Sequence, residues 1–502
     1  MRLTRRNVLR ATALGAMGSP GCSSRKLGEL PGDDPFRHGV ASGDPMPDRV
    51  ILWTRLSVRD FGLTLLGDWE VFEDPEATRL VVSGKFETDA SRDFTVKVDA
   101  EGLDAGTTYY YRFGYDGWHS ALGRTKTAPE GDVSRLRFAV VSCASFGHGY
   151  YHAYRAIAER LDLDGVVHLG DYIYEYGPGY GDVRPYEPKK ELIELEDYRA
   201  RYAYHRTDRD LLELHRQHPM MAVWDDHEVA NNAWFGGAEN HDPSEGDYDE
   251  RKRAAQQAYH EWMPIRTEDP ARVHRRLSFG DLVDLLLLDT RHWGRSQQID
   301  DPDDPQFESE ERTMLGEDQE SWLSDQFAES EARWKLLAQQ VMVADLPGDL
   351  LSTDSWSGYP AARRRFFGLG HGDDPLVVLT GDIHMSWAFD LVDAEDDTPL
   401  GAEFVTTSVT SPSLERELAE RARELAFEQD YVKFADLWRR GYMLIDVDRE
   451  RVQAEWYLYD AVDETTARER FSGAAALREG ERVIVLVDEA SDPPEDPPAA
   501  AP

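Results

Sequence analysis

The sequence has few cysteines, few basic side chains and no apolar run long enough to cross a bilayer. Of its 502 residues only Cys22 and Cys143 are cysteines, which excludes a fold held together by a disulfide framework. The 56 basic residues face 96 acidic ones, and the formal charge of −40 argues against nucleic-acid binding or broad attachment to anionic membranes. An anionic substrate would therefore need local positive charge, from metals and a few arginines, at its site.

The N-terminal 30 residues have the features of a targeting segment. Thr4–Arg10 contains paired arginines and precedes a short apolar stretch of small residues that ends near Met17. This resembles a twin-arginine export signal, so residues 1–30 predict passage through the twin-arginine export machinery to the periplasm, the cell surface or the medium. A frayed basic terminus is the alternative. Ser19–Cys22 weakly resembles a lipobox, which makes Cys22 a candidate lipid anchor.

Length and composition predict more than one domain. Residues 36–129 have the alternating, aromatic-rich pattern of strands, clearest over Arg49–Arg55 and Thr107–Tyr115, and predict a small β-sandwich. From residue 134 to residue 488 strands alternate with helices, which is typical of α/β layering. Residues 489–502 are acidic and rich in proline and alanine, and we expect a disordered tail.

Five apolar, strand-like runs are followed by side chains of types that bind metals or take part in catalysis. Near-continuous apolar strands suit a sheet covered on both faces, and ligands of such sheets gather beyond the carboxyl ends of the strands. The pattern therefore predicts that these strand ends meet at one rim. The runs and the residues that follow them are 136–142 with Cys143, 166–169 with Asp171 and Tyr174, 220–224 with Asp226 and His227, 283–288 with Arg291, and 376–380 with Asp382 and His384.

The residue types at this rim favour metal chemistry on phosphate. Asp171, Asp226, His227, Asp382 and His384 are hard or borderline ligands, which suit divalent and trivalent cations that polarise phosphoryl oxygens. Two such cations ~3.5–4 Å apart can clamp the attacking and leaving oxygens of an in-line displacement.

Several separated motifs, in order along nearly the whole mature chain, resemble those of PhoD-type alkaline phosphatases, within the calcineurin-like and purple-acid metallophosphatase superfamily. The resemblance implies an α/β fold: a two-sheet metallophosphatase core preceded by an all-β sandwich. It also implies iron(III) with one or two calcium ions, and hydrolysis of phosphate mono- or diesters by a metal-bound hydroxide or oxide that attacks phosphorus. The motifs are Arg37–Pro45, Gly170–Tyr174, Trp224–Asn232, Asp289–Arg291, Met314–Leu323 and Gly381–Trp387.

Carried over residue by residue, the resemblance assigns a role to each of these side chains. Iron would be bound by Cys143 as thiolate, Tyr174 as phenolate and His384, with Asp171 as the bridge to the second metal. Asp226, Asp382 and Asn232 would serve calcium, and Arg291 would bind the substrate phosphate. His227 is left open as a ligand, a proton donor or a supporting group. The run Trp334–Val341 offers no histidine where many dinuclear relatives have one, which favours the calcium-using variant.

The residues also leave other interpretations open. Cys143 alone is compatible with a buried apolar role or with a nucleophile, and Tyr174 with simple packing. A phosphodiesterase, including one with phospholipase D-like cleavage, fits the same scaffold. If the protein is not an enzyme, the alternative is a non-catalytic binding protein at the cell surface.

Overall fold

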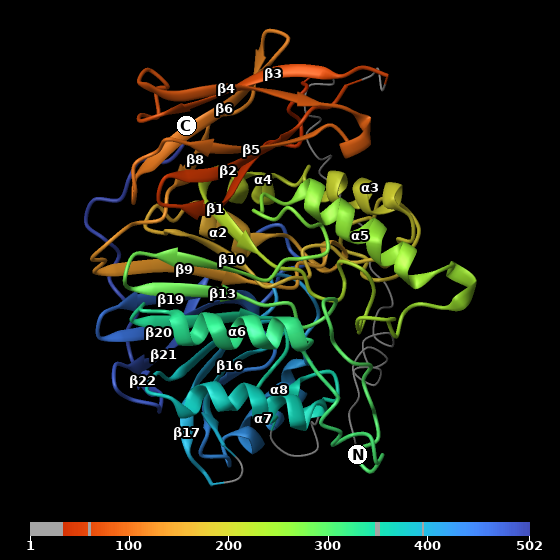
Figure 1. The fold of residues 1–502 in the computed structure, drawn as a ribbon, viewed down its shortest axis with the longest axis vertical. Helices are drawn as coiled ribbons and strands as arrows, with labels where there is room; N and C mark the ends of the chain where they lie inside the picture. The colour runs from red at the N-terminus through yellow and green to blue at the C-terminus, as the bar shows by residue number, and fades with distance from the viewer. Residues whose placement is uncertain (1–33, 59–61, 347–351, 394–395) are drawn as a thin grey trace.

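The computed structural model describes residues 34–58, 62–346, 352–393 and 396–502 (Figure 1). The predicted export signal, residues 1–30, and the candidate lipidation site Cys22 lie outside the described residues. Across the described ranges, no helix is both long enough and apolar enough to cross a membrane.

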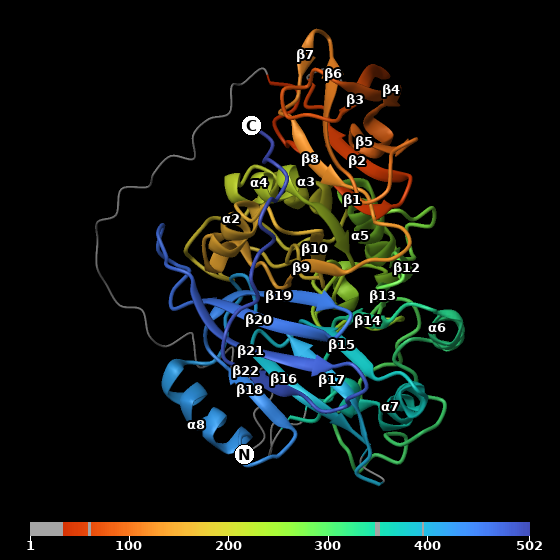
Figure 2. The ribbon, with the colours of Figure 1, turned by 90° about the vertical axis from the view of Figure 1, so that its left-hand side faces the viewer.

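Two large sheets form the centre of the molecule, and Figure 2 shows the first descending from β5 near the top to β22. The ten-stranded sheet has the order β22 (Val485–Val487), β21 (Arg470–Arg478), β20 (Arg451–Tyr459), β19 (Arg440–Asp448), β9 (Arg135–Val141), β10 (Gly165–His168), β11 (Pro219–Ala222), β1 (Val40–Met46), β2 (Arg49–Arg55) and β5 (Thr95–Glu101). The seven-stranded sheet has the order β12 (Arg275–Phe279), β13 (Val283–Leu287), β14 (Trp334–Gln339), β15 (Leu376–Thr380), β17 (Pro399–Val405), β16 (Ser386–Val392) and β18 (Val432–Asp436).

Alternating side chains of the seven-stranded sheet enter two different cores. On β13, Leu285 and Leu287 join the central core shared with the ten-stranded sheet, whereas Leu286 joins the core beneath the outer helices. Side chains of α6, α7 and α8 line this outer core, and Figure 1 shows α6 and α7 along that face. Both faces are therefore covered, which explains the continuous apolar runs. The helices are α2 (His152–Ala158), α3 (Leu195–His205), α4 (Arg209–Gln217), α5 (Tyr248–Trp262), α6 (Glu317–Glu329), α7 (Pro360–Phe367) and α8 (Arg416–Ala426).

The N-terminal strands form two layers around a separate apolar core. One layer is the five-stranded sheet β3 (Leu65–Phe72), β4 (Leu80–Thr88), β6 (Thr108–Tyr115), β7 (Trp118–His119) and β8 (Gly123–Lys126). The other layer, β1, β2 and β5, belongs to the ten-stranded sheet, because β1 pairs in parallel with β11. The predicted fold class, a two-sheet α/β core preceded by a sandwich, is confirmed, and the shared sheet joins its two parts.

The C-terminal tail differs from the disorder that its composition predicts. It runs from the ten-stranded sheet past α4 to the N-terminal sandwich (Figure 2). Gln217 of α4 donates to the carbonyl of Ala501 at 3.0 Å and accepts its N–H at 2.9 Å, and Ala501 is buried. Tyr110 donates to the carbonyl of Ala499 at 2.7 Å. Specific hydrogen bonds at the far end of the tail thus order a segment whose own composition carries little apolar area.

Candidate metal centre

The candidate site lies where strand ends of the two sheets meet. Strands β9, β10 and β11 are parallel neighbours, so their carboxyl ends share one edge. The turns beyond them are hydrogen-bonded to each other: Cys143 N–H donates to the Gly170 carbonyl at 3.1 Å and Ala144 N–H to the Asp171 carbonyl at 2.9 Å. A parallel bridge between Ser142 and Ser408 links this edge to the segment that follows β17 of the other sheet. The rim predicted from the sequence is therefore a real edge of the fold.

A first group of side chains combines sulfur, oxygen and nitrogen donors. Ligand atoms of Cys143, Asp171 and His384 all lie within 4.8 Å of one another. The hydroxyl of Tyr174 joins them, 2.8 Å from Asp171 Oδ2 and 3.4 Å from His384 Nε2. Cys143 and Tyr174 are completely buried. These are the four residues that the sequence predicts around iron.

The tautomer of His384 is fixed by a backbone carbonyl. Its Nδ1 lies 2.7 Å from the oxygen of Pro412, which can only accept, so Nδ1 carries the hydrogen. Nε2 then presents a lone pair on the side of Tyr174, which is the arrangement that metal-binding histidines need.

Two further groups extend the cluster through shared carboxylates. Asp171, Asp226 and His227 form one, and Asp225, Asp226 and Asp382 form the other, again with ligand atoms within 4.8 Å. Asp171 and Asp226 each belong to two groups, so the donors make one continuous cluster with separate positions for cations. Asp225 is not among the ligands predicted from the sequence, although it stands directly before Asp226 at the same strand end.

The backbone at this cluster is held in an unusual conformation. Five predicted ligands have positive φ angles: Cys143 at 60°, Asp171 at 56°, Asn232 at 52°, Asp382 at 60° and His384 at 63°. Residues other than glycine seldom adopt this left-handed region, and such conformations concentrate at functional sites. The turns aim the side chains inward at the expense of backbone strain.

Gly170 and Glu228 shape two of these turns. A Cβ at Gly170 would lie 2.3 Å from the Asp225 nitrogen, so only glycine lets the two turns approach. The buried carboxylate of Glu228 accepts backbone N–H groups from Asp171 at 3.0 Å, Tyr172 at 2.5 Å and Asp225 at 2.7 Å. One side chain therefore fixes the spacing of two strand ends that carry ligands.

The electrostatics of the cluster favour bound cations. Burial, and then the carboxylate of Asp171, raise the pKa of Cys143 well above its ordinary value. Burial likewise raises the pKa of Asp171 to about 7, with Asp226 and Asp382 adding to the rise and His227 opposing it. Asp171 Oδ1 and Asp225 Oδ2 are buried and have no hydrogen-bond partner within the described chain. Buried carboxylate oxygens of this kind are normally paired or bound to metal, so the donor set fits multivalent cations.

His227 is held by a second carboxylate. Its Nδ1 lies 2.7 Å from Glu175 Oε2, and its ring packs 4.3 Å from that of Tyr174. Burial alone would lower the pKa of His227, but Glu175, Asp226 and Asp171 raise it to about 10. Because Glu175 holds Nδ1, Nε2 is the nitrogen left for a ligand or for proton transfer.

Arg291 lies among the carboxylates of the cluster. Its side chain is completely buried and donates to Asp225 at 2.5 Å, Asp354 at 2.9 Å and Asp382 at 2.8 Å. The sequence could not show these partners because Asp354 comes from a distant loop. The role of Arg291 in binding the substrate phosphate stays a prediction, and in the structure its guanidinium contacts carboxylates of the cluster.

Asn232 meets the cluster through its backbone. Its N–H donates to Asp226 Oδ2 at 2.6 Å, while its side-chain Nδ2 donates to Glu239 at 2.7 Å. Its role as a calcium ligand stays a prediction.

Some supporting residues carry no strong signal in the sequence. Ser411, whose Oγ lies 2.6 Å from the Tyr174 hydroxyl, and Asp354 lie in loops without a recognisable motif. Glu175 and Glu228, by contrast, stand next to predicted motif residues, and their proximity to Tyr174 and His227 was the available signal.

Comparison with known proteins places these observations in a family. A family model described as PhoD-like phosphatase matches residues 138–456, and one described as PhoD-like phosphatase, N-terminal domain, matches residues 21–129. Alkaline phosphatase D of Bacillus subtilis (strain 168) is 38% identical over 469 residues, which cover 86% of this chain and 79% of the relative.

Solved structures show the same relationship. The structure of PhoD matches with a TM-score of 0.83 and 34% identity, over 91% of this chain and 93% of its own. A purple acid phosphatase from yellow lupin (Lupinus luteus) seeds matches with a TM-score of 0.56 over 86% of this chain and 72% of its own. At 12% identity, that second similarity establishes a shared fold.

Proposed function

The chain belongs to the PhoD-like phosphatase family and is a metal-dependent hydrolase of phosphate esters, and we propose that its cluster holds iron(III) beside calcium. The observation that carries the assignment of metals is the difference between the two ends of the cluster. One end offers a thiol, a phenol and an imidazole around Asp171, and the other offers only carboxylates. Thiolate and imidazole suit transition metals, whereas an all-oxygen set suits calcium.

The residues divide between the two metals accordingly. Iron(III) would be held by Cys143, Tyr174, His384 and Asp171, because a trivalent charge favours loss of the thiol and phenol protons. Calcium would be held by Asp225, Asp226 and Asp382, with Asp171 able to reach both positions. When bound, the cations supply Lewis-acid stabilisation of the charge that develops on the phosphoryl oxygens.

The protein's own side chains organise the rest of the reaction. Pro412 keeps the proton of His384 on Nδ1, so Nε2 always faces the cluster. Glu228 and Gly170 set the distance between the turns that carry Asp171 and Asp225. Arg291 pairs with Asp225 and Asp382 from the protein side and offsets part of the negative charge of the cluster.

His227 is positioned to move a proton. Glu175 fixes the ring through Nδ1, which leaves Nε2 available, and a ring nitrogen of His227 lies within 4.8 Å of ligand atoms of Asp171 and Asp226. Each bound cation adds positive charge near the ring and opposes the rise in its pKa caused by the carboxylates. We assign to Nε2 the donation of a proton to the departing alkoxide.

The proposal is tested with p-nitrophenyl phosphate and its bis ester on metal-loaded enzyme. Asp171→Asn should lower kcat for both esters by several orders of magnitude, because Asp171 belongs to both metal positions. Glu70→Gln, on β3 of the sandwich, is the matched control and should keep full activity. A strong preference for the bis ester would identify a phosphodiesterase, and undiminished hydrolysis by Asp171→Asn would overturn the assignment.

We further propose export of the folded enzyme by the twin-arginine pathway, supported by the paired arginines Arg5 and Arg6. Replacing both by lysine should retain activity inside the cell, whereas unchanged export would contradict the proposal. Attachment of lipid at Cys22 is tested by fatty-acid labelling of Cys22→Ala beside the unmodified protein.

A further inference from the structure

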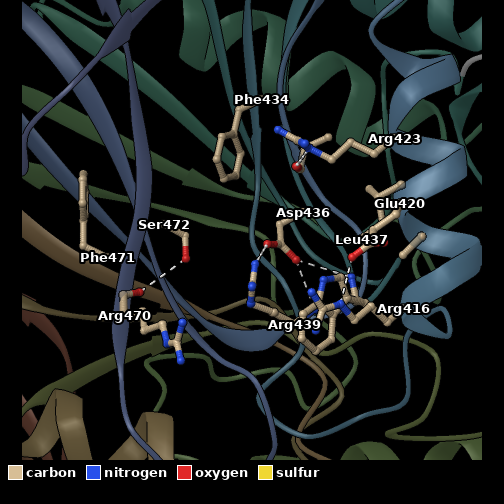
Figure 3. A pocket seen from close by; sticks show the side chains of 13 residues that line it. Arg416, Glu420, Arg423, Phe434, Asp436, Leu437, Arg439, Arg470, Phe471 and Ser472 are labelled. Carbon is tan, nitrogen blue, oxygen red and sulfur yellow. Dashed lines mark hydrogen bonds and ion pairs between the residues drawn. The ribbon is translucent and has the colours of Figure 1, made fainter.

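A cavity of about 380 Å³ opens between α8, β18 and β21, away from the metal ligands (Figure 3). Helix α8 forms one wall, the end of β18 and the segment after it form the floor, and β21 forms the opposite wall. None of the candidate metal ligands lines it. Its volume lies in the usual range for small-molecule sites, roughly 300–1,000 Å³.

Arginine dominates the charged side chains of this cavity. Arg416, Arg423, Arg439 and Arg470 line it, against Glu420 and Asp436. This local excess of positive charge is unusual in a chain with 96 acidic and 56 basic residues. It marks a place where an anion can approach an otherwise repelling surface.

Arg423 and Arg470 face the cavity from opposite walls (Figure 3). Arg423 donates through Nε to the carbonyl of Ala435 at 2.9 Å, and no carboxylate of the described residues lies within ion-pair distance of it. Arg470 has one partner, Asp460, at 2.9 Å. Both guanidinium groups therefore retain donors for a ligand, and such donors match phosphate oxygens in pairs.

The ring of Trp438 packs against the other two arginines. The guanidinium of Arg416 lies 5.0 Å and that of Arg439 lies 4.5 Å from the Trp438 ring. Asp436 and Asp460 each hold Arg439 at 2.7 Å. Positions fixed in this way reduce the entropy lost when a ligand binds.

The cavity floor is connected to the metal centre by one short segment. The hydroxyl of Thr407 lies 2.7 Å from the carbonyl oxygen of Arg439 and 3.2 Å from that of His384. The same segment continues to Ser411 and Pro412, which contact Tyr174 and His384. This segment thus links the cavity floor to the metal centre.

We propose that this cavity binds a phosphate group, separate from the one undergoing hydrolysis. The occupant is either free inorganic phosphate or a second phosphate of an extended substrate. The inference concerns a different place from the metal centre and does not depend on the identity of the metals.

Calorimetry of the metal-loaded enzyme with inorganic phosphate tests the site. Wild type should show two classes of binding, one at the metals and one in the cavity. Each arginine lost should weaken the second class about tenfold, so Arg423→Gln/Arg470→Gln should lose it while keeping the first. Arg421→Gln, on the same helix with Glu417 as its partner, is the matched control and should retain both.

Kinetics then separate the two sources of phosphate. If the occupant is part of the substrate, the double variant should raise KM about a hundredfold for an alkyl bisphosphate and leave KM for p-nitrophenyl phosphate unchanged. An unchanged KM together with lost binding would assign the cavity to free phosphate. Unaltered turnover of p-nitrophenyl phosphate shows that the variant is folded. Arg470→Gln alone changes an exposed side chain and should weaken the second class of phosphate binding about tenfold. A single class of binding in wild type, or two classes in the double variant, would overturn the proposal.

Discussion

One oxygen of Glu228 accepts the backbone N–H of Asp171 at 3.0 Å and that of Asp225 at 2.7 Å. These two N–H groups come from the turns after β10 and β11, so a single carboxylate sets the separation of two candidate metal ligands. Supporting contacts of this kind commonly change metal affinity or activity ~10–100-fold when they are removed.

Glu228→Gln should therefore lower calcium affinity and kcat by roughly 10–100-fold, because the amide offers one acceptor oxygen where the carboxylate offers two. Isothermal titration of metal-depleted protein and turnover of p-nitrophenyl phosphate measure the two effects. Glu228→Asp keeps the charge and should recover part of the affinity.

Glu455→Gln is the matched control for that change. Glu455 is equally buried and accepts three hydrogen bonds, from Gln453, Tyr457 and Ser491, on a strand remote from the cluster. Glu455→Gln should lower the free energy of unfolding without changing the affinity for metal. Equal losses of metal affinity in the two variants would show that Glu228 acts only through general stability.

Tyr174→Phe tests the phenolate ligand. Phenolate and thiolate bound to iron(III) give visible charge-transfer absorption, so the variant should lose intensity and change colour while retaining the thiolate contribution. Tyr172→Phe removes the hydroxyl of a neighbouring buried tyrosine, which contacts His215 at 2.9 Å, and should leave the spectrum unaltered. A spectrum of Tyr174→Phe identical to that of wild type would exclude Tyr174 from the iron shell.

Arg291→Gln should destabilise the fold rather than weaken substrate binding. It leaves Asp225 and Asp382 without their buried cation, whereas Asp354 keeps Arg295 at 2.6 Å, and breaking buried pairs of this kind costs ~3–5 kcal/mol. Chemical unfolding and KM, measured on the same preparation, distinguish the two roles. A large rise in KM at unchanged stability would show instead that Arg291 binds the substrate.

His218 makes stability depend on pH on the acidic side. Burial lowers its pKa to about 3, against ~6.5 in the unfolded chain. Between these values the unfolded chain binds a proton that the folded chain does not. The contribution of His218 to the free energy of unfolding is therefore complete above pH ~6.5, and it decreases by up to about 1.4 kcal/mol for each pH unit as the pH is lowered. His218→Gln should flatten this dependence in urea titrations, whereas replacing the exposed His119 should not.

Much of the fold could be predicted from the sequence because it depends on local pattern. The runs 49–55 and 376–380 coincide with β2 and β15, since apolar strands and their bounding turns are encoded within a few residues. Helices α3 and α4 are separated by only three residues, and α4 begins where the side chain of Asp208 accepts the N–H groups of Asp210 and Leu211. Periodicity alone does not mark that break.

The candidate site was predictable where ligands follow strands, and was not where partners come from distant loops. Cys143, Asp171 and Tyr174 meet as expected because the parallel strands β9 and β10 share an edge, and His384 joins them from beyond the end of β15 in the other sheet. The burial of Arg291 depends on Asp354, 63 residues away, which no local pattern connects to it. The ordered tail likewise depends on Gln217, which belongs to another part of the chain.

Anomalous diffraction at the iron absorption edge, on crystals of the active, exported protein, tests directly whether iron occupies the proposed site. We expect one strong iron peak bounded by Cys143 Sγ, the Tyr174 hydroxyl, His384 Nε2 and Asp171, with calcium density among Asp225, Asp226 and Asp382. Fully active crystals without an anomalous peak at those four side chains would contradict it.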